Sequence, residues 1–111
     1  MSTSLVDIIN KEIDDLRGLV QARDKAIALE KNPEFKELIL DGFCRDRAAE
    51  YVQQSVSRAI SVEDREHALA LSQASGYFLD FLNAIVAMGN QAEDNIERLQ
   101  QELHETLTAE E

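Results

Sequence analysis

The chain is poor in residues that interrupt helices and in residues that cross-link a fold. Its 111 residues include one proline, four glycines and one cysteine, Cys44, and 5% are aromatic. Proline and glycine are the residues least compatible with a helix interior, whereas Ala, Leu, Glu, Gln and Arg favour it. We therefore expect helix throughout and no sheet. The single cysteine excludes an internal disulfide and fits a reducing compartment, with a small buried side chain as its expected role.

Basic residues are also scarce. The 11 Lys and Arg are outnumbered by 22 Asp and Glu, which gives a formal net charge of −11 at pH 7. Non-specific binding to nucleic acid or anionic lipid depends on Lys and Arg that neutralise phosphates, so direct nucleic-acid binding is not expected. The first residues, Met1 to Ser4, contain no basic segment followed by an apolar one, so we expect no secretory signal and a cytoplasmic protein.

The stretch from Ala68 to Ala92 contains one charged residue, Asp80, and neither Lys nor Arg. A membrane-spanning helix needs about 20 predominantly apolar residues, and amides interrupt this stretch at several positions. We interpret it as a buried helix that forms the core of the monomer, and we expect no membrane association.

Apolar and small residues recur at alternating four- and three-residue steps from Leu71 to Leu103, the spacing that keeps one seam of a helix facing a partner. Ser61, followed three residues later by Asp64, has the spacing of a helix cap. The sequence therefore predicts a long helix over 62–107, roughly 65–70 Å at 1.5 Å per residue. A helix of that length must project from a compact domain or pack on another chain.

A second seam runs through the predicted first helix, 4–31, with Ser2 or Ser4 as its cap. Its members are Val6, Ile9, Ile13, Leu16, Val20 and Ile27. Arg23 occupies the one seam position that is not apolar. Its stem could lie over the seam edge with a hydrated head, its head could pair with an acid on a neighbour, or it could mark a change of partner.

Two shorter helices are expected between these long ones. Pro33 suits the first position of a helix that Asn32 caps, and the dense apolar residues that follow predict a largely buried helix over 33–42. Gly42 would end or bend this helix, and 44–60 would form an amphipathic helix. The expected fold is all-α: a helical hairpin or bundle of about four helices with coiled-coil-like packing, in a single domain of residues 1–111.

Two surfaces are candidates for binding. The long helix exceeds the first one by far, which leaves seam unpaired and predicts a homo-oligomer. The self-association seam consists of Leu82, Ile85, Gly89, Ala92, Ile96, Leu99 and Leu103. At Gly89 the small seam residue indicates either a close approach of two backbones or a bend in the helix. The acidic partner face consists of Glu93, Asp94, Glu97, Glu102 and Glu105.

Catalytic, cofactor and metal sites are not predicted. The chain has no Gly-rich phosphate loop, no nucleophile elbow and no Cys/His/Asp set with interpretable spacing. Asp64 and His67 have the spacing of a di-metal bundle motif, but His104 has no such carboxylate, so the set is incomplete. Asp80 is the one carboxylate whose pKa burial would raise, and a structural hydrogen bond is its favoured role over general-base catalysis.

The run Asn32-Pro33-Glu34-Phe35-Lys36-Glu37-Leu38-Ile39-Leu40-Asp41-Gly42-Phe43, together with Met88-Gly89-Asn90-Gln91-Ala92-Glu93, resembles small helical proteins of tailed bacteriophages. Such proteins often lie near portal and capsid genes. The resemblance implies a non-enzymatic head or connector component or an assembly factor. Its partners would be other phage structural proteins, and its location would be the host cytoplasm during assembly, or the virion.

The charge supports an alternative of another class. A dense negative face resembles the phosphates of nucleic acid and can occupy a basic cleft on another protein. The alternative function is therefore a small acidic inhibitor of a host defence or nucleic-acid enzyme.

Overall fold

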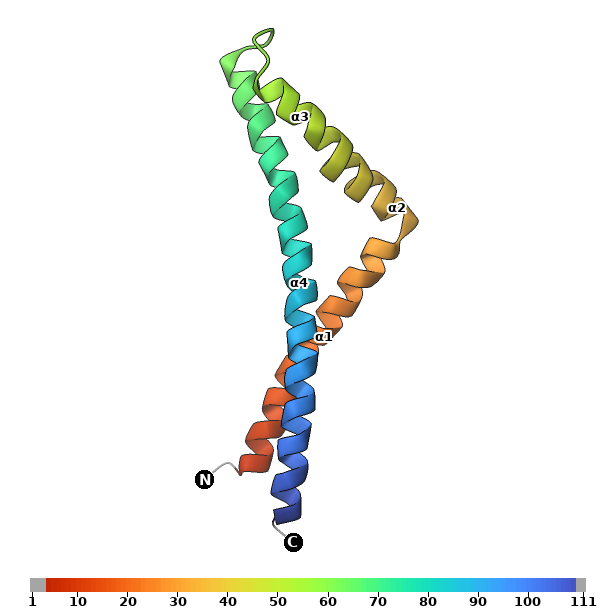
Figure 1. Ribbon diagram of the computed structural model, residues 1–111, viewed down its shortest axis with the longest axis vertical. Coiled ribbons are helices and arrows are strands. Elements are labelled where there is room, and N and C mark those ends of the chain that lie inside the picture. The colour runs from red at the N-terminus through yellow and green to blue at the C-terminus, as the bar shows by residue number, and fades with distance from the viewer. Residues whose placement is uncertain (1–3, 110–111) are drawn as a thin grey trace. The chain divides into compact units, whose positions relative to one another are not determined.

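The computed structural model describes residues 4–109, and within that range every regular element is a helix (Figure 1). The elements are α1 (Leu5–Lys31), α2 (Pro33–Phe35), the π-helix η1 (Lys36–Arg47), α3 (Ala48–Ser55) and α4 (Val62–Ala109). The predicted all-α fold with a long C-terminal helix is confirmed. Because α2, η1 and α3 follow one another without a break, the described residues form three helical segments in place of about four.

Short polar side chains begin each of the three segments, as the sequence predicts. The side-chain oxygens of Ser4, Asn32 and Ser61 each accept a hydrogen bond from a backbone N–H two or three residues further on, at 3.0–3.1 Å. These bonds satisfy N–H groups that have no partner within the helix. Ser4 is thus the cap of α1; Ser2 lies outside the described residues.

Asn32 separates α1 from the segment that Pro33 begins. Its backbone is extended, with φ −68° and ψ 121°, and its side chain accepts from the N–H groups of Glu34 and Phe35. Proline disfavours helical geometry in the residue before it, and it lacks the N–H that the first helical position would leave unpaired. The cap and the proline therefore act together to start a new helix at this point.

Removing this cap should destabilise the protein measurably. We expect Asn32→Ala to lower the free energy of unfolding by about 1 kcal/mol, because two backbone N–H groups lose their acceptor. Asn32→Asp should have little effect, since the carboxylate accepts the same bonds. Asn10→Ala, at an exposed position inside α1, is the matched control and should be neutral or slightly stabilising. Urea unfolding followed by circular dichroism measures all three, and equal losses in Asn32→Ala and Asn10→Ala would contradict the capping role.

Gly42 does not end a helix, so the predicted break near residue 43 is wrong. Gly42 lies inside η1, where a Cβ atom added to it would come 2.9 Å from the carbonyl oxygen of Glu37, five residues earlier. A π-helix pairs residues five apart and is wider than an α-helix. The missing side chain leaves room for that carbonyl, so the helix continues through Gly42 in a widened form.

The third predicted helix also ends earlier than expected, at Ser55 and not at residue 60. After it, the N–H of Val56 donates to the carbonyl of Gln53, and the N–H of Ala59 donates to the hydroxyl of Ser57. Serine side chains that bond to nearby backbone offer the chain an alternative to helix. A turn over residues 56–61 therefore precedes α4, which reaches Ala109.

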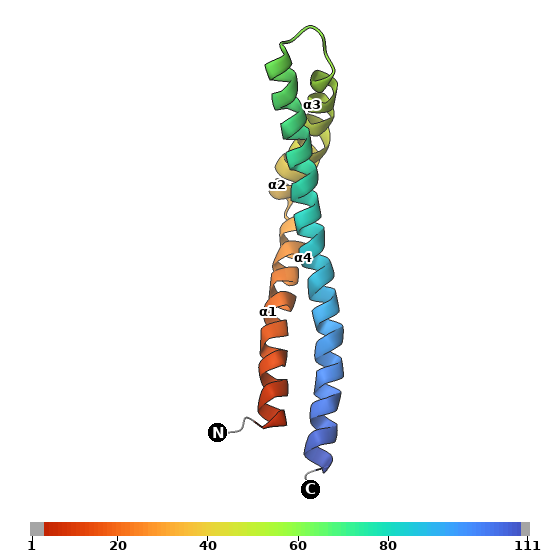
Figure 2. The same cartoon turned by 90° about the vertical axis from the view of Figure 1, so that its left-hand side faces the viewer.

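The chain divides into two compact units. The first comprises residues up to Ala26 together with those from Ala84 onward, and in it α1 and α4 run antiparallel, side by side in both views (Figures 1 and 2). Its hydrophobic core consists of Ile9, Ile13 and Leu99, with Leu16, Ile96 and Leu103 packed around them. Apolar residues from the predicted seams of the two helices thus meet each other here.

The second unit, residues 27–83, buries fewer residues than the first, namely Ala68, Ser75 and Leu82. The rings of Phe35 and Phe78 lie 6.3 Å apart, and the guanidinium of Arg65 donates to the carbonyl of Ser57 at 3.2 Å. No residue of α2, η1 or α3 is buried, so the prediction of a largely buried helix after Pro33 is wrong. Leu38 is 69% exposed. The apolar residues of this segment meet too few neighbours within the chain to become a core.

Candidate functional site

The seam assigned to self-association lies on the face of α4 that the chain itself covers. Leu82, Gly89, Ala92 and Leu99 are buried, and Ile85, Ile96 and Leu103 are half-buried. Leu99 belongs to the core that α1 completes. This face is therefore occupied in the described structure, and it is not available to a second copy without opening the pair of helices. The surface that self-association would use must be sought elsewhere.

Gly89 of α4 packs directly against Arg23 of α1. A Cβ atom added to Gly89 would lie 2.1 Å from the Cβ of Arg23, far inside any tolerable contact. The two positions are the exceptions in their seams, since Arg23 is the polar residue and Gly89 the residue without a side chain. Of the two interpretations of Gly89, close approach is the one observed. Both exceptions are visible in the sequence, whereas their contact is seen only in the structure.

The guanidinium of Arg23 is held by polar partners from both helices. Nη1 donates to the carboxylate of Glu93 at 2.6 Å and to the side-chain oxygen of Asn90 at 3.0 Å. Nε and Nη2 donate to the carboxylate of Asp24 at 3.1 and 2.9 Å. The Arg23 side chain as a whole is 11% exposed. The interpretation that Arg23 pairs with an acid on a neighbour is thus the correct one.

This cluster, Arg23 with Gly89, Asn90 and Glu93, fixes how α1 and α4 are aligned. The hydrogen bond to Glu93, and after it the one to Asp24, raise the pKa of Arg23 above its ordinary value, so the side chain remains charged. A charged group with planar donors needs its partners in one geometry. If one helix slid along the other, the guanidinium of Arg23 would move away from Glu93. The aliphatic part of Arg23 would then clash with a residue larger than Gly89.

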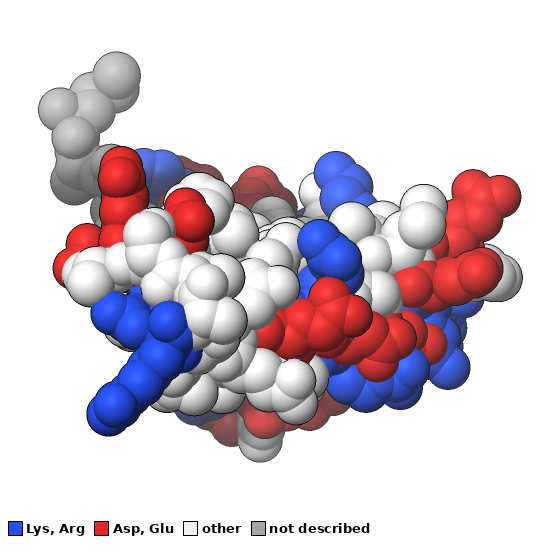
Figure 3. Space-filling view, turned by 90° about the horizontal axis from the view of Figure 1, so that it is seen from above, with Lys and Arg blue, Asp and Glu red and all other residues white. Residues whose placement is uncertain are grey.

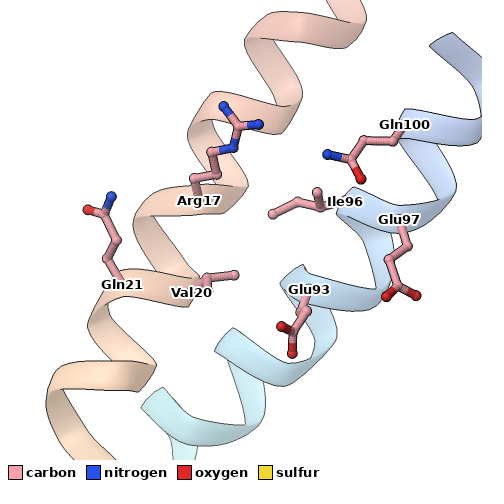
Figure 4. A pocket seen from close by; sticks show the side chains of 7 residues that line it. All are labelled: Arg17, Val20, Gln21, Glu93, Ile96, Glu97 and Gln100. Atoms are coloured by element: carbon pink, nitrogen blue, oxygen red, sulfur yellow. The ribbon is translucent and has the colours of Figure 1, made fainter. Parts of the chain in front are cut away.

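An open groove lies beside this cluster, between α1 and α4 (Figure 4). Its volume is about 340 Å³. The side chains of Val20 and Ile96 point toward each other across its apolar floor, and polar side chains border it (Figure 4). The lining residues are Arg17, Val20, Gln21, Glu93, Ile96, Glu97 and Gln100. Arg17, Glu93 and Glu97 place charges of both signs along the groove.

The predicted acidic partner face is exposed, but part of it is already paired. All five carboxylates, Glu93, Asp94, Glu97, Glu102 and Glu105, are exposed. Glu93 binds Arg23, and Glu102 accepts a hydrogen bond from Arg98 at 3.0 Å. Elsewhere, basic and acidic side chains are interspersed on the face shown in Figure 3. The ion pairs of Glu93 and Glu102 reduce the negative electrostatic potential that a basic partner would meet at this face.

The residues considered for chemistry are dispersed. Asp80 is exposed, so the expectation of a buried carboxylate in the uncharged stretch is wrong. Burial raises the pKa of the half-buried Cys44 thiol, which opposes formation of a reactive thiolate. His67 and His104 are both exposed. Within residues 4–109, no group of three His, Cys, Asp or Glu side chains is arranged to hold a metal ion.

The most unusual surface lies in the second unit, on α4. Tyr77 is 72% exposed and Phe81 is 62% exposed, and they lie four residues apart, on one face of the helix. Ala70 and Ala74, also exposed, precede them at the same alternating steps of four and three residues. We call these four residues the aromatic face. They directly precede the seam residues Leu71, Ser75, Phe78 and Leu82, which are buried or half-buried. The aromatic face therefore lies about 100° round the helix from the seam.

The fold defines a class: an all-helical protein, whose first and last helices pack on each other around a small apolar core within the described residues. None of the helices within residues 4–109 contains a stretch long and apolar enough to cross a membrane. Comparison of the chain with protein-family models, with curated proteins and with solved structures finds no match.

Proposed function

We propose that the protein is a non-enzymatic structural or assembly protein of a tailed bacteriophage, which acts through helix–helix contacts with head or connector proteins. The phage assignment is supported by the resemblance of residues 32–43 and 88–93 described above. The mode of action is supported by the apolar surface of the second unit. The proposed site of action is the host cytoplasm during assembly.

The observation that carries the proposal is the exposure of large apolar side chains in residues 27–83. Eight of them lie there: Leu29, Leu38, Val52, Val56, Val62, Leu69, Tyr77 and Phe81. Single exposed apolar residues are normal, whereas exposed apolar residues that adjoin one another are typical of binding sites. A partner would supply the neighbours that the chain itself does not.

Affinity purification from phage-infected cells tests the proposal. The tagged full-length chain should retain head or connector proteins, and it should keep them at high salt because apolar burial is insensitive to screening. Leu38→Ser combined with Val52→Ser should release them, since both side chains are exposed and the fold does not depend on them. Gln53→Ser, an exposed polar position on α3, is the matched control and should retain them.

The same experiment distinguishes the acidic inhibitor. An inhibitor would retain one host enzyme, and raised salt would release that enzyme because the contact is electrostatic. It would also be insensitive to the paired substitution of Leu38 and Val52. Recovery of such an enzyme, or recovery of no phage structural protein, would overturn the proposed function.

A further inference from the structure

We infer that η1 is a two-state element, which in its π form turns an apolar stripe of the second unit to solvent and in an α form turns that stripe onto α4. The stripe consists of Leu38, Ala49, Val52 and Val56, all exposed in the structure, and we call it the outer stripe. Its regulatory role rests on the proposed function, which uses this surface, whereas the two forms of the helix do not.

A π-helix of this length is unusual. Most π-helices are single turns inside α-helices, and they occur frequently at functional sites. In this chain η1 contains 12 residues, Lys36–Arg47, and continues directly into α3. A turn of a π-helix holds more residues than a turn of an α-helix, so the pairing in η1 decides which side of α3 faces α4.

The covered side of this segment includes residues that recur every four or five positions, the spacing that a π-helix aligns. These half-buried residues are Phe35, Ile39, Cys44 and Ala48. The ring of Phe35 lies 6.3 Å from that of Phe78 on α4. Further along, Tyr51 of α3 lines a groove together with Ala68 and Leu71 of α4. In the π form, therefore, this side of the segment lies along α4.

The outer stripe has the spacing of an α-helix instead. From Phe35, steps that alternate three and four residues lead to Leu38, Gly42, Arg45, Ala49, Val52 and Val56. That repeat keeps one side of an α-helix against a partner helix. All of these residues after Phe35 are exposed except Gly42, which is half-buried, and Arg45 is the one charged member. The sequence thus contains two sets of residues that share Phe35, one aligned by a π-helix and the other by an α-helix.

Gly42 makes the π form accessible. A Cβ atom at this position would lie 2.9 Å from the carbonyl oxygen of Glu37, and that oxygen belongs to the backbone, so it cannot rotate away. Glycine also weakens an α-helix relative to alanine. Both effects of Gly42 favour the π form. Conversion of η1 to an α-helix would turn α3 by about half a turn about its axis and bring the outer stripe round to α4.

A partner that binds the outer stripe would select the π form, because only that form presents the stripe to solvent. In the α form, α4 and the partner would compete for the same apolar side chains. Two packings of one segment that differ by little free energy constitute a switch of this kind. The pairing of η1 would therefore regulate the apolar surface that carries the proposed function.

Alkylation of Cys44, the only cysteine of the chain, reports the form of η1 in the full-length protein. Cys44 is half-buried in the π form, whereas nine residues of α-helix, two and a half turns, would place it opposite Phe35. Gly42→Ala should therefore speed the reaction of Cys44 with iodoacetamide by at least about fivefold. Gly76→Ala is the matched control, because a Cβ atom there has nothing within 4 Å, and it should change the rate by less than about twofold.

A second reporter distinguishes the switch from a general loosening of the helix. In a chain with Cys44→Ala and Val52→Cys, the cysteine lies on the outer stripe and is exposed in the π form. Here Gly42→Ala should slow alkylation by at least about threefold, because the α form covers this position. Loosening of the helix would instead speed alkylation at both positions.

Ala48→Glu acts on the same equilibrium without altering Gly42. Ala48 is half-buried in the π form, and a carboxylate placed there disfavours that form. Ala48→Glu should therefore speed the alkylation of Cys44, as Gly42→Ala does. Ala49→Glu, at the neighbouring exposed position, is its control and should not speed it. Circular dichroism of each variant shows whether the helices are intact, and Ala48→Glu decides the result if Gly42→Ala does not fold.

Three results would overturn the two-state element. They are an unchanged Cys44 rate in both Gly42→Ala and Ala48→Glu, faster alkylation at both reporter positions, and equal effects of Ala48→Glu and Ala49→Glu. None of these measurements involves a partner, so they do not depend on the recovery of phage head proteins. Gly42→Ala should also reduce that recovery, and full recovery with a converted η1 would overturn the regulatory role alone.

Discussion

Replacing Leu99 with alanine should lower the free energy of unfolding by about 2–5 kcal/mol. Leu99 is 4% exposed and belongs to the only buried cluster of the first unit's described residues, where it packs with Ile9 and Ile13. Truncation removes the transfer free energy of the lost methyl groups and leaves a cavity that two helices close only in part. Because a pair of helices buries few side chains, no other residue compensates for this loss.

Urea unfolding followed by circular dichroism measures the effect. Leu107→Ala, in the same helix at a 46% exposed position, is the control and should change the free energy of unfolding by less than about 0.5 kcal/mol. If Leu99→Ala is too unstable to measure, Leu99→Met keeps the volume and should cost less than about 1.5 kcal/mol. Similar losses for Leu99→Ala and Leu107→Ala would contradict the placement of the core.

Gly89→Ala should destabilise the protein by about 1–3 kcal/mol, although alanine is the better helix former. The added Cβ would lie 2.1 Å from the Cβ of Arg23, and both atoms are attached to helix backbones, so neither can rotate away. The helices must move apart, which weakens the Arg23 hydrogen bonds and the neighbouring core. This cost exceeds the gain in helix propensity, about 0.5–1 kcal/mol.

Gly76→Ala is the matched control, because it is in the same helix and a Cβ atom there has nothing within 4 Å. It should stabilise the protein by about 0.5–1 kcal/mol, so the two glycine substitutions should have opposite signs. Thermal unfolding by calorimetry compares them. A stabilising Gly89→Ala would show that α1 and α4 do not approach closely at this point.

A double-variant comparison identifies the contact. Arg23→Ala keeps the Cβ that Gly89→Ala would strike, whereas Arg23→Gly removes it. Gly89→Ala should therefore be better tolerated in the Arg23→Gly background than in the Arg23→Ala background, although both lose the ion pair with Glu93. Equal tolerance would mean that the guanidinium, and not the crowded backbone approach, makes Gly89 necessary.

The acidic part of α4 contributes to the core of the first unit, and the uncharged stretch is buried along one face only. The sequence predicts that the uncharged stretch forms the monomer core and that the acidic part binds a partner. In the structure the acidic part carries the core around Leu99, and the uncharged stretch exposes Tyr77 and Phe81. A low charge density indicates that a surface must be covered. It does not indicate whether the same chain covers it.

Local features of this protein follow from the sequence alone. The helices begin at Ser4, Asn32 and Ser61 because each of these side chains accepts a hydrogen bond from a backbone N–H two or three residues further on. Both partners of each bond are therefore close together in the sequence. The all-helical class follows in the same way from propensity and from the scarcity of proline and glycine. The widened helix at Gly42 was missed because a glycine within a helical pattern is also a frequent end signal.

Only the tertiary structure decided which stripe of α4 is covered. The seam from Leu71 and the aromatic face from Ala70 have the same alternating steps and differ by one residue, so spacing cannot rank them. Likewise, α1 and α4 approach each other closely at Gly89 because Arg23 lies across from it, 66 positions away in the sequence. Packing between distant segments depends on the shape and charge of both surfaces at once, and a periodic pattern along one helix describes only one of them.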